Sequence, residues 1–278
     1  MNTSAAPSRE RQAPKGTVLP RFSANLGLLW ADRPLLQRIE AAARAGFRAI
    51  EMHCPYDVPA AEVAASAQHN GLRLLGINTS LGDFARGERG LGALPGRERD
   101  FQTTVDQAIA YCVASGASAI HAMAGNVAAD DRERARSVFA RNLRVAADKA
   151  AAHELTLLLE ALNPRDNPGY FYSTVAEAVS LIEELALPNI KLQFDVYHVA
   201  CAEGDVLKKL ERHLSVIGNV QIAAVPSRAE PDEGEIAYPA VFAALDALGY
   251  PGWVGCEYRP RGNLEEGLRW TRSLGVTL

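Results

Sequence analysis

The sequence predicts a (β/α)8 barrel, the TIM-barrel fold, built as a single domain over residues 21–278. The chain has 278 residues, and one such barrel typically takes about 250 residues. From Phe22 onward, short apolar runs alternate with Ala-rich segments of helical periodicity. Strands that alternate with helices form a parallel sheet with right-handed crossovers, and eight such units close into a barrel.

Each expected strand is an apolar run, and each is followed by an expected helix. The strands are expected at Phe22–Leu29, Ala49–His53, Leu72–Asn78, Ala119–Met123, Thr156–Leu162, Ile190–Val196, Val216–Ala223 and Trp253–Tyr258. The helices are expected at Asp32–Ala45, Pro59–Asn70, Glu98–Ser115, Asp130–His153, Thr174–Ala186, Asp205–His213, Tyr238–Leu248 and Asn263–Leu274. Glycine follows four of these helices, as a left-handed C-terminal cap requires, at Gly46, Gly71, Gly116 and Gly249. An open doubly wound sheet is the alternative, but it usually has a GxGxxG turn after its first strand, and Asn25–Leu29 lacks that pattern.

Composition and charge exclude several classes of protein. The chain is 48% hydrophobic and 22% charged, and its formal net charge of -4 argues against a nucleic-acid partner. Its four cysteines form no CxxC pair or zinc motif, which indicates reduced thiols in a cytoplasmic protein. No apolar run approaches the roughly 20 residues that span a bilayer, so no membrane partner is expected. Residues 1–20 lack the apolar region of a secretory signal and are expected to form a disordered tail.

Four expected strands carry a polar residue in their second half, although barrel strands are buried on both faces and should be apolar. These residues are Glu160, Asp195, Gln221 and Glu257. A buried carboxylate has to pair, take up a proton or bind a cation. The carboxyl ends of the strands meet at the mouth of the barrel, where TIM-barrel active sites lie. We therefore expect these four side chains to surround one site.

An all-oxygen set of donors favours a hard cation such as Mg2+, Mn2+ or Ca2+. The expected cofactor is one divalent ion, Mg2+ or Mn2+, with positions left open for a substrate that chelates through two oxygens. The alternative is that each acid pairs with a nearby Arg or Lys. Ion pairing explains a single buried acid well, but it explains four matching positions on successive strands poorly.

From Arg21 to about Thr271, the sequence resembles the hydroxypyruvate isomerases, which are xylose-isomerase-like barrels. The matching stretches are Arg21–Leu26, Glu88–Arg97, Asn142–Ala147, Phe194–His198, Glu230–Ile236 and Gly252–Tyr258. The resemblance places the four metal ligands of that family on the four residues found above. It also implies that Glu160 and Glu257 are the catalytic proton acceptor and donor.

More distant relatives, the ketose 3-epimerases, suggest further substrate contacts. They place a substrate-binding His three residues after the second ligand, which matches His198, and an Arg shortly after the third ligand, which approximately matches Arg228. His121 ends an expected strand and is a candidate substrate contact, with a structural histidine as the alternative. Asn78, in the pair Asn78–Thr79, is the fourth candidate.

The resemblance implies isomerisation of hydroxypyruvate to tartronate semialdehyde by proton transfer through an enediolate. Gly87–Gly90 and Gly267–Trp270 resemble this branch, whereas His121–Gly125 and Pro226–Glu235 resemble the 2-oxo-tetronate isomerases, which act on a four-carbon acid. Hydroxypyruvate is slightly favoured, and 2-oxo-tetronate isomerase or ketose 3-epimerase activity is the alternative. The expected partner is a small hydroxy-oxo acid, and association into a homo-oligomer is left open.

Two other functions are compatible with this barrel. A metal-dependent endonuclease of abasic DNA needs a basic groove and several histidines, whereas this chain has six histidines and a net charge of -4. A sugar-binding barrel without activity would not need an intact set of four ligands.

The segment Gly82–Arg97 carries five glycines and is long for a loop between a strand and a helix. It is predicted to form a lid over the site, with an ordinary solvated loop as the alternative. Arg86, Arg89 and Arg97 are candidates to bind a substrate carboxylate, which arginine recognises through two parallel hydrogen bonds.

Overall fold

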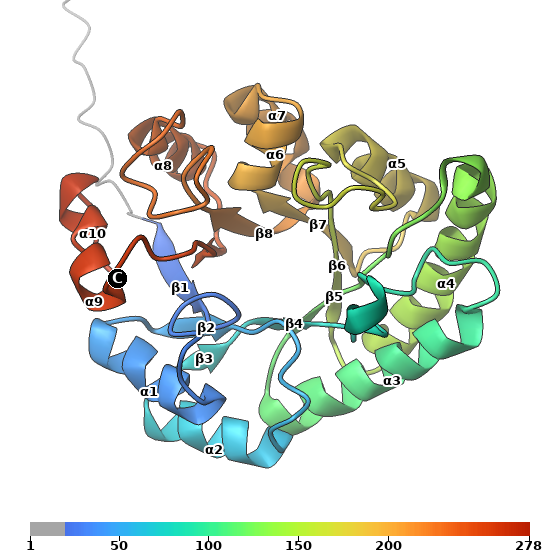
Figure 1. Ribbon diagram of the computed structural model, residues 1–278, viewed down its shortest axis with the longest axis horizontal. Helices are drawn as coiled ribbons and strands as arrows, with labels where there is room; N and C mark the ends of the chain where they lie inside the picture. Colours follow the sequence, from blue (N-terminus) through green and yellow to red (C-terminus); the bar gives the residue numbers. More distant parts are fainter. Residues whose placement is uncertain (1–19) are drawn as a thin grey trace, which may run out of the picture.

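A computed structural model describes residues 20–278, and apart from Pro20 the expected tail of residues 1–20 lies outside the described part. Parallel strands form one sheet in the order β3-β2-β1-β9-β8-β7-β6-β5-β4. The strands are β1 (Arg21–Asn25), β2 (Ala49–Glu51), β3 (Arg73–Leu74), β4 (Gly76–Asn78), β5 (Ala119–His121), β6 (Thr156–Glu160), β7 (Ile190–Asp195), β8 (Ile217–Ile222) and β9 (Trp253–Cys256). Figure 1 looks down the barrel and shows the strands inside a ring of helices.

The two outermost strands of that order are two pieces of one expected strand, Leu72–Asn78. The pieces β3 and β4 are separated only by Leu75, and they pair with β2 and β5, respectively. The Leu75 amide donates to the Ile50 carbonyl at 2.9 Å, and the Met52 amide donates to the Gly76 carbonyl at 3.0 Å. Both pieces therefore contact the β2 segment, and the sheet closes on itself. This closure confirms the predicted TIM barrel.

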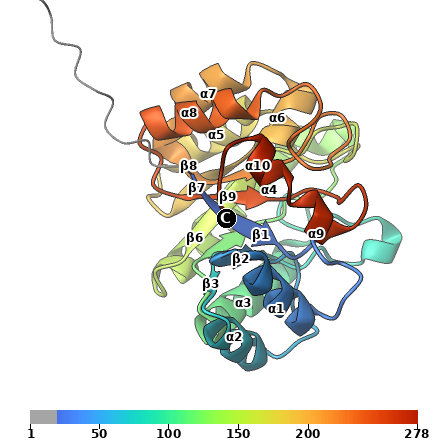
Figure 2. The same ribbon diagram turned by 90° about the vertical axis from the view of Figure 1, so that its left-hand side faces the viewer.

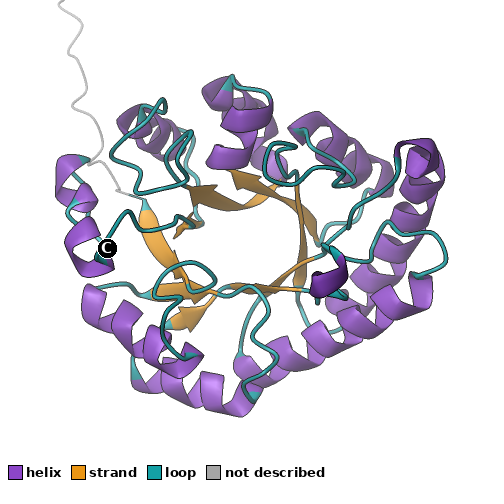
Figure 3. Ribbon diagram, viewed as in Figure 1, coloured by secondary structure: helices purple, strands orange, loops and turns teal. Residues whose placement is uncertain are grey.

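The helices lie on the outside of the barrel (Figure 3). They are α1 (Leu35–Ala45), α2 (Ala60–His69), α3 (Glu98–Ser115), α4 (Arg132–Ala151), α5 (Val175–Leu185), α6 (Val196–Ala202), α7 (Val206–His213), α8 (Tyr238–Ala247), α9 (Leu264–Gly267) and α10 (Trp270–Ser273). Two features differ from the prediction. The short helix α6 was not predicted, because its residues are largely apolar and show no helical period, and the expected last helix is divided into α9 and α10. Over residues 20–278, no helix is both long and apolar enough to cross a membrane.

The predicted helix ends are confirmed where glycine was expected. Gly46 and Gly116 end α1 and α3 in the left-handed region, with φ of 105° and 82°. Only glycine adopts this region without steric strain. The end of the chain packs back onto its beginning, because the ring of Trp270 on α10 lies 5.5 Å from the ring of Phe22 on β1. Figure 2 shows α9 and α10 beside that strand.

Candidate functional site

The structure brings the four predicted ligands together at the carboxyl end of the barrel. Glu160 and Asp195 end β6 and β7, Gln221 lies one residue before the end of β8, and Glu257 directly follows β9. All four side chains are buried. The register aligns Asp195 with Gln221 across neighbouring strands, and Gln221 with Gly255 across the next pair. The four residues therefore lie within one residue of the carboxyl ends of four adjacent strands, although the ladder pairs Glu160 with Gln193 rather than with Asp195.

A cavity of about 340 Å³ opens at this mouth. Its lining includes two of the predicted ligands, Glu160 and Glu257, and all four predicted substrate contacts: Asn78, His121, His198 and Arg228. These residues come from β4, β5, β6, α6 and the loops after β8 and β9. Asn78 and Glu257, which are 179 positions apart in the chain, thus line one space.

Three of the four predicted ligands present a buried oxygen that has no hydrogen-bond partner within residues 20–278. These atoms are Glu160 Oε1, Asp195 Oδ2 and Gln221 Oε1. Leaving a buried polar atom unpaired typically costs about 1–3 kcal/mol, and more for a charged group. Three such oxygens on neighbouring strands fit a divalent cation, because oxygen donors are the ligands that hard cations prefer.

Glu257 differs from the other three because both of its oxygens have partners. Asn25 donates to Oε2 at 2.8 Å, and Arg228 donates to Oε1 at 2.6 Å. Arg228 also lies 3.8 Å from Asp195 Oδ2, and its guanidinium faces the ring of Tyr197 at 5.0 Å. The ion-pair alternative therefore applies to Glu257, which a cation would share with Arg228.

The buried carboxyl groups of the site have strongly shifted pKa values. Burial raises the pKa of Glu160 well above its ordinary value, and the charges of Glu257 and Asp195 raise it further. Burial also raises the pKa of Asp195 to about 7. Burial alone would raise the pKa of Glu257, but His53 and Arg228 lower it to about 2. A cation bound among these groups would favour their ionised forms.

His198 completes a buried group with Glu160 and Asp195, in which potential ligand atoms lie within 4.8 Å of one another. Its Nε2 atom is 3.7 Å from Asp195 Oδ2 and 4.0 Å from Glu160 Oε1. Its Nδ1 atom accepts a hydrogen bond from the Asn163 amide at 3.0 Å, and burial lowers the pKa of the ring to about 3. A neutral ring that accepts at Nδ1 carries its proton on Nε2. His198 therefore offers a donor to the pocket, which favours a substrate contact over a metal ligand.

His121 has a similar position on the other side of Glu160. Its Nδ1 atom is 3.3 Å from Glu160 Oε2, and neither ring nitrogen has a hydrogen-bond partner among the described residues. Burial lowers the pKa of His121 to about 4. A buried, neutral and unpartnered imidazole on the cavity wall is available to a ligand, which favours the predicted substrate contact over a structural role.

The long loop is anchored in its second half and exposed in its first. The Gly92 and Ala93 amides donate to the carbonyls of Met123 and Ala124, and Gly90 approaches Met123 so closely that a Cβ there would lie 2.5 Å from its atoms. Residues 82–87, by contrast, are all exposed. This exposed first part is the candidate for the predicted lid.

The three candidate arginines of this loop differ in what they contact. Arg97 forms ion pairs with Glu88 and Asp100, so its charge is already compensated. Arg89 lines the cavity and lies over the ring of Phe84, which is 60% exposed. Arg86 is absent from the residues that line the cavity. Of the three, Arg89 is placed to reach a ligand.

Some site residues escaped the sequence analysis. Arg259 lines the cavity just beyond β9, and Asn25 donates to Glu257. Glu51, Gln193 and Asn219 are buried inside the barrel. The signal for these last three was present, since each is a polar residue in a strand that should be apolar on both faces.

Known proteins are similar to this chain over nearly its whole length. A family model described as "Xylose isomerase-like TIM barrel" matches residues 39–274. The 2-oxo-tetronate isomerase of Cupriavidus necator is 48% identical over 255 residues, which cover 91% of this chain and 98% of that protein. The hydroxypyruvate isomerase of Escherichia coli is 38% identical over 251 residues, which cover 90% and 97%. A crystal structure from Brucella melitensis, named AP endonuclease, family 2, has a TM-score of 0.89 at 43% identity and covers 92% of this chain and 99% of that one.

Proposed function

Because the chain belongs to the xylose isomerase-like TIM-barrel family, and within it to the hydroxypyruvate isomerases and 2-oxo-tetronate isomerases, we propose that it is a metal-dependent isomerase of 2-oxo-tetronate. The observation that carries metal dependence is the set of three buried, unpartnered oxygens on Glu160, Asp195 and Gln221. Glu257 would be the fourth ligand. The proposed ion is Mg2+ or Mn2+, which an all-oxygen site suits.

The names of the relatives support the four-carbon acid better than hydroxypyruvate, which the resemblance alone slightly favoured. Proteins named 2-oxo-tetronate isomerase are 48%, 42% and 39% identical to this chain. The Escherichia coli hydroxypyruvate isomerase is 38% identical, and a mouse protein named putative hydroxypyruvate isomerase is 42% identical. The two substrates share a carboxylate, a carbonyl and a hydroxyl group, and they differ by one hydroxymethylene carbon.

Glu160 and Glu257 are the proposed proton-transfer residues. Strands β7 and β8 lie between β6 and β9, so the two side chains approach a substrate in the cavity from different sides. One carboxylate would take the proton from C3 of 2-oxo-tetronate, which leaves an enediolate across C2 and C3. The other carboxyl group would return a proton to C2 while the hydroxyl proton of O3 passes to O2, so the carbonyl moves to C3. A divalent ion, when bound, polarises the carbonyl and hydroxyl oxygens and stabilises the negative charge.

His198 and two arginines are proposed to orient the substrate. The Nε2–H group of His198 would donate to a substrate oxygen beside Glu160 and Asp195. Arg89 and Arg259 line the cavity, and within residues 20–278 neither forms an ion pair with a carboxylate. Because arginine binds carboxylates through two parallel hydrogen bonds, they are proposed to hold the acid group of the substrate.

Turnover of both acids tests the proposal. The purified protein is treated with a chelator and reloaded with Mn2+ or Mg2+, and kcat/KM is measured on 2-oxo-tetronate and on hydroxypyruvate. We expect activity only after reloading, and at least about tenfold higher kcat/KM on the four-carbon acid, since one extra carbon in a fitted pocket changes kcat/KM by about 10–200-fold. A tenfold preference for hydroxypyruvate would assign the three-carbon substrate instead.

Cleavage of abasic DNA, the activity in the name of the Brucella melitensis protein, is less well supported. The chain has a formal net charge of -4, which repels a phosphate backbone. Incubation of the metal-loaded protein with an abasic duplex provides the check, and we expect the duplex to stay intact.

A further inference from the structure

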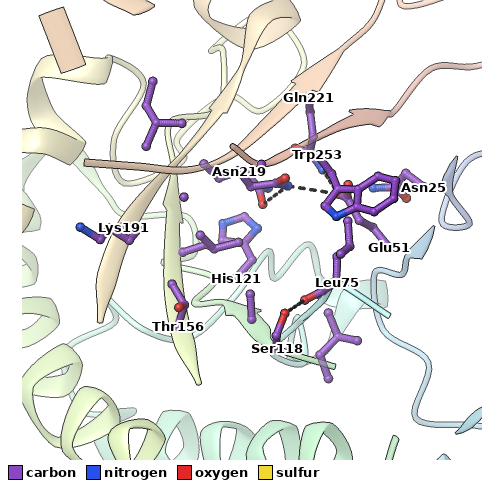
Figure 4. Close-up of a pocket in the computed structure, with 18 of the residues that line it drawn as sticks. Asn25, Glu51, Leu75, Ser118, His121, Thr156, Lys191, Asn219, Gln221 and Trp253 are labelled. Carbon is purple, nitrogen blue, oxygen red and sulfur yellow. Dashed lines mark hydrogen bonds between the residues drawn. The ribbon is translucent and has the colours of Figure 1, made fainter. Parts of the chain in front are cut away.

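Beneath the proposed metal ligands, the barrel interior contains a buried network of polar side chains, which we call the interior network: Ser23, Glu51, Gln193 and Asn219. All four are buried. Glu51, Gln193 and Asn219 line a cavity of about 460 Å³ inside the barrel, and Ser23 contacts Glu51. TIM-barrel interiors are usually filled by Val, Ile and Leu. Figure 4 shows Glu51 and Asn219 beside Gln221 on the lining of this cavity.

Glu51, at the end of β2, is the centre of this network. Its Oε1 atom accepts from Ser23 Oγ at 2.6 Å, and its Oε2 atom accepts from Gln221 Nε2 at 2.8 Å and from Asn219 Nδ2 at 3.2 Å. These three donors are neutral. Burying a carboxylate without a cation is unfavourable for stability, so a contribution to stability does not explain why a glutamate is present here.

Strand β9 leaves room for the Glu51 carboxylate. A Cβ atom at Gly255 on β9 would lie 2.4 Å from Glu51 Oε1 and 2.9 Å from Gln221 Cγ. Cβ atoms essentially never approach a neighbour that closely, so any larger residue at 255 would displace the Glu51–Gln221 pair. Gly255 on β9 therefore leaves the space that the contact between Glu51 and Gln221 occupies.

The contact with Glu51 determines which end of the Gln221 amide faces the site. An amide binds a cation only through its oxygen, and its NH2 group only donates. Glu51 Oε2 accepts from Gln221 Nε2 and from Asn219 Nδ2, so it holds Nε2 on the interior side. Gln221 Oε1 is then directed away from Glu51, and this is the atom that is buried without a partner.

A second, longer chain of hydrogen bonds leads from Glu51 to Glu160. Asn219 Nδ2, which donates to Glu51, also lies 3.3 Å from Gln193 Oε1. Gln193 Nε2 in turn donates to Glu160 Oε2 at 2.7 Å. Because the Asn219 amide donates to Glu51, it presents its NH2 group to Gln193 Oε1, and Gln193 in turn donates to Glu160 Oε2. Glu160 Oε1 has no hydrogen-bond partner among the described residues.

We propose that Glu51 is a positioning residue that holds Gln221, and through Asn219 and Gln193 also Glu160, with one oxygen of each directed at the metal site. This inference rests on the proposed function, because it assumes that Gln221 is a metal ligand. Glu51 itself contacts neither substrate nor metal in this proposal. It acts by preventing the amide of Gln221 from rotating its NH2 group into the site.

The test is the affinity for Mn2+, measured by titration calorimetry on chelator-treated protein without substrate. Glu51→Ala removes the acceptor, and we expect the Kd for Mn2+ to rise about 10–100-fold, as for loss of other groups that orient metal ligands. Glu51→Gln keeps an oxygen that can accept from Gln221 but also permits the opposite amide orientation, so we expect an intermediate Kd. Ser118→Ala is the matched control, because Ser118 lines the same cavity but its hydroxyl group, within residues 20–278, donates only to the Leu75 carbonyl. Its Kd should stay within twofold of wild type.

Unfolding of the metal-free variants separates positioning from a merely structural role. If Glu51 positions Gln221, Glu51→Gln should unfold at a denaturant concentration close to that of wild type and yet bind Mn2+ more weakly. A Kd for Glu51→Ala and Glu51→Gln within twofold of wild type would overturn the positioning role while leaving the metal site intact. A wild-type protein that binds no Mn2+ or Mg2+ would overturn the proposed function and this inference together.

Discussion

Replacing Asp195 by Asn should weaken metal binding and stabilise the metal-free protein at the same time. Burial is the main cause that raises the pKa of the Asp195 carboxyl group from an ordinary 3.8 to about 7. One pKa unit corresponds to about 1.4 kcal/mol, so ionised Asp195 destabilises the metal-free fold by about 4 kcal/mol above about pH 7. Asn is neutral at every pH and keeps the Oδ1 acceptor that receives the Tyr197 amide at 2.8 Å at the start of α6.

The pH dependence has a definite sign. Because the pKa of Asp195 is higher in the folded than in the unfolded chain, the folded state binds this proton more tightly. The free energy of unfolding of metal-free wild type should therefore fall as the pH rises from about 4 to about 7, and the Asn variant should lack this part of the decrease. The two proteins should be nearly equally stable below about pH 4, and the variant should be more stable at pH 8.

Urea unfolding of chelator-treated protein at several pH values measures this difference, and calorimetric titration with Mn2+ measures the loss of affinity. The reasoning is refuted if the Asn variant is less stable than wild type at pH 8, since Arg228, 3.8 Å away, would then stabilise the carboxylate more than burial destabilises it. Normal Mn2+ affinity in the variant would remove Asp195 from the ligand set.

The remaining predictions concern the reaction. Removal of the metal by a chelator should abolish turnover and Mn2+ or Mg2+ should restore it; full activity in verified metal-free protein would contradict the metal site. Turnover in D2O should place deuterium on the product carbon, because proton transfer exchanges with solvent and a hydride shift does not, so an unlabelled product would exclude the enediolate. Glu160→Gln and Glu257→Gln should each lower kcat by about 10²–10⁴-fold in steady-state assays, and an unaffected variant would lose its assigned role. Shortening residues 82–87, the exposed part of the loop, should raise KM and lower kcat with little change in Tm, and an unchanged kcat/KM would show that the loop is no lid. Arg89→Ala should raise KM for the acid far more than Arg86→Ala, which removes the same charge outside the cavity lining; equal effects would contradict the carboxylate contact.

The sequence by itself determined the barrel and the position of the four proposed metal ligands. Apolar runs that alternate with helical segments are local patterns, and the closure of the sheet follows once eight such units are present. Glu160, Asp195, Gln221 and Glu257 stood out because each breaks the apolar pattern of a strand buried on both faces. The same rule applied to Glu51, Gln193 and Asn219 would have found the interior network, although it could not have separated that network from the ligands.

Only the tertiary structure decided what each polar group faces. Whether His198 on α6 offers a proton or a lone pair depends on the Asn163 amide, which contacts its Nδ1 atom at 3.0 Å from the loop after β6. Whether Arg89 or Arg97 is free depends on Glu88 and Asp100, which pair with Arg97. The hydrogen bond at His198 joins residues that are 35 positions apart in the chain, and the ion pairs of Arg97 depend on how its own loop folds. Periodicity places a side chain at the mouth of the barrel, but the contacts made there determine which of its atoms can act.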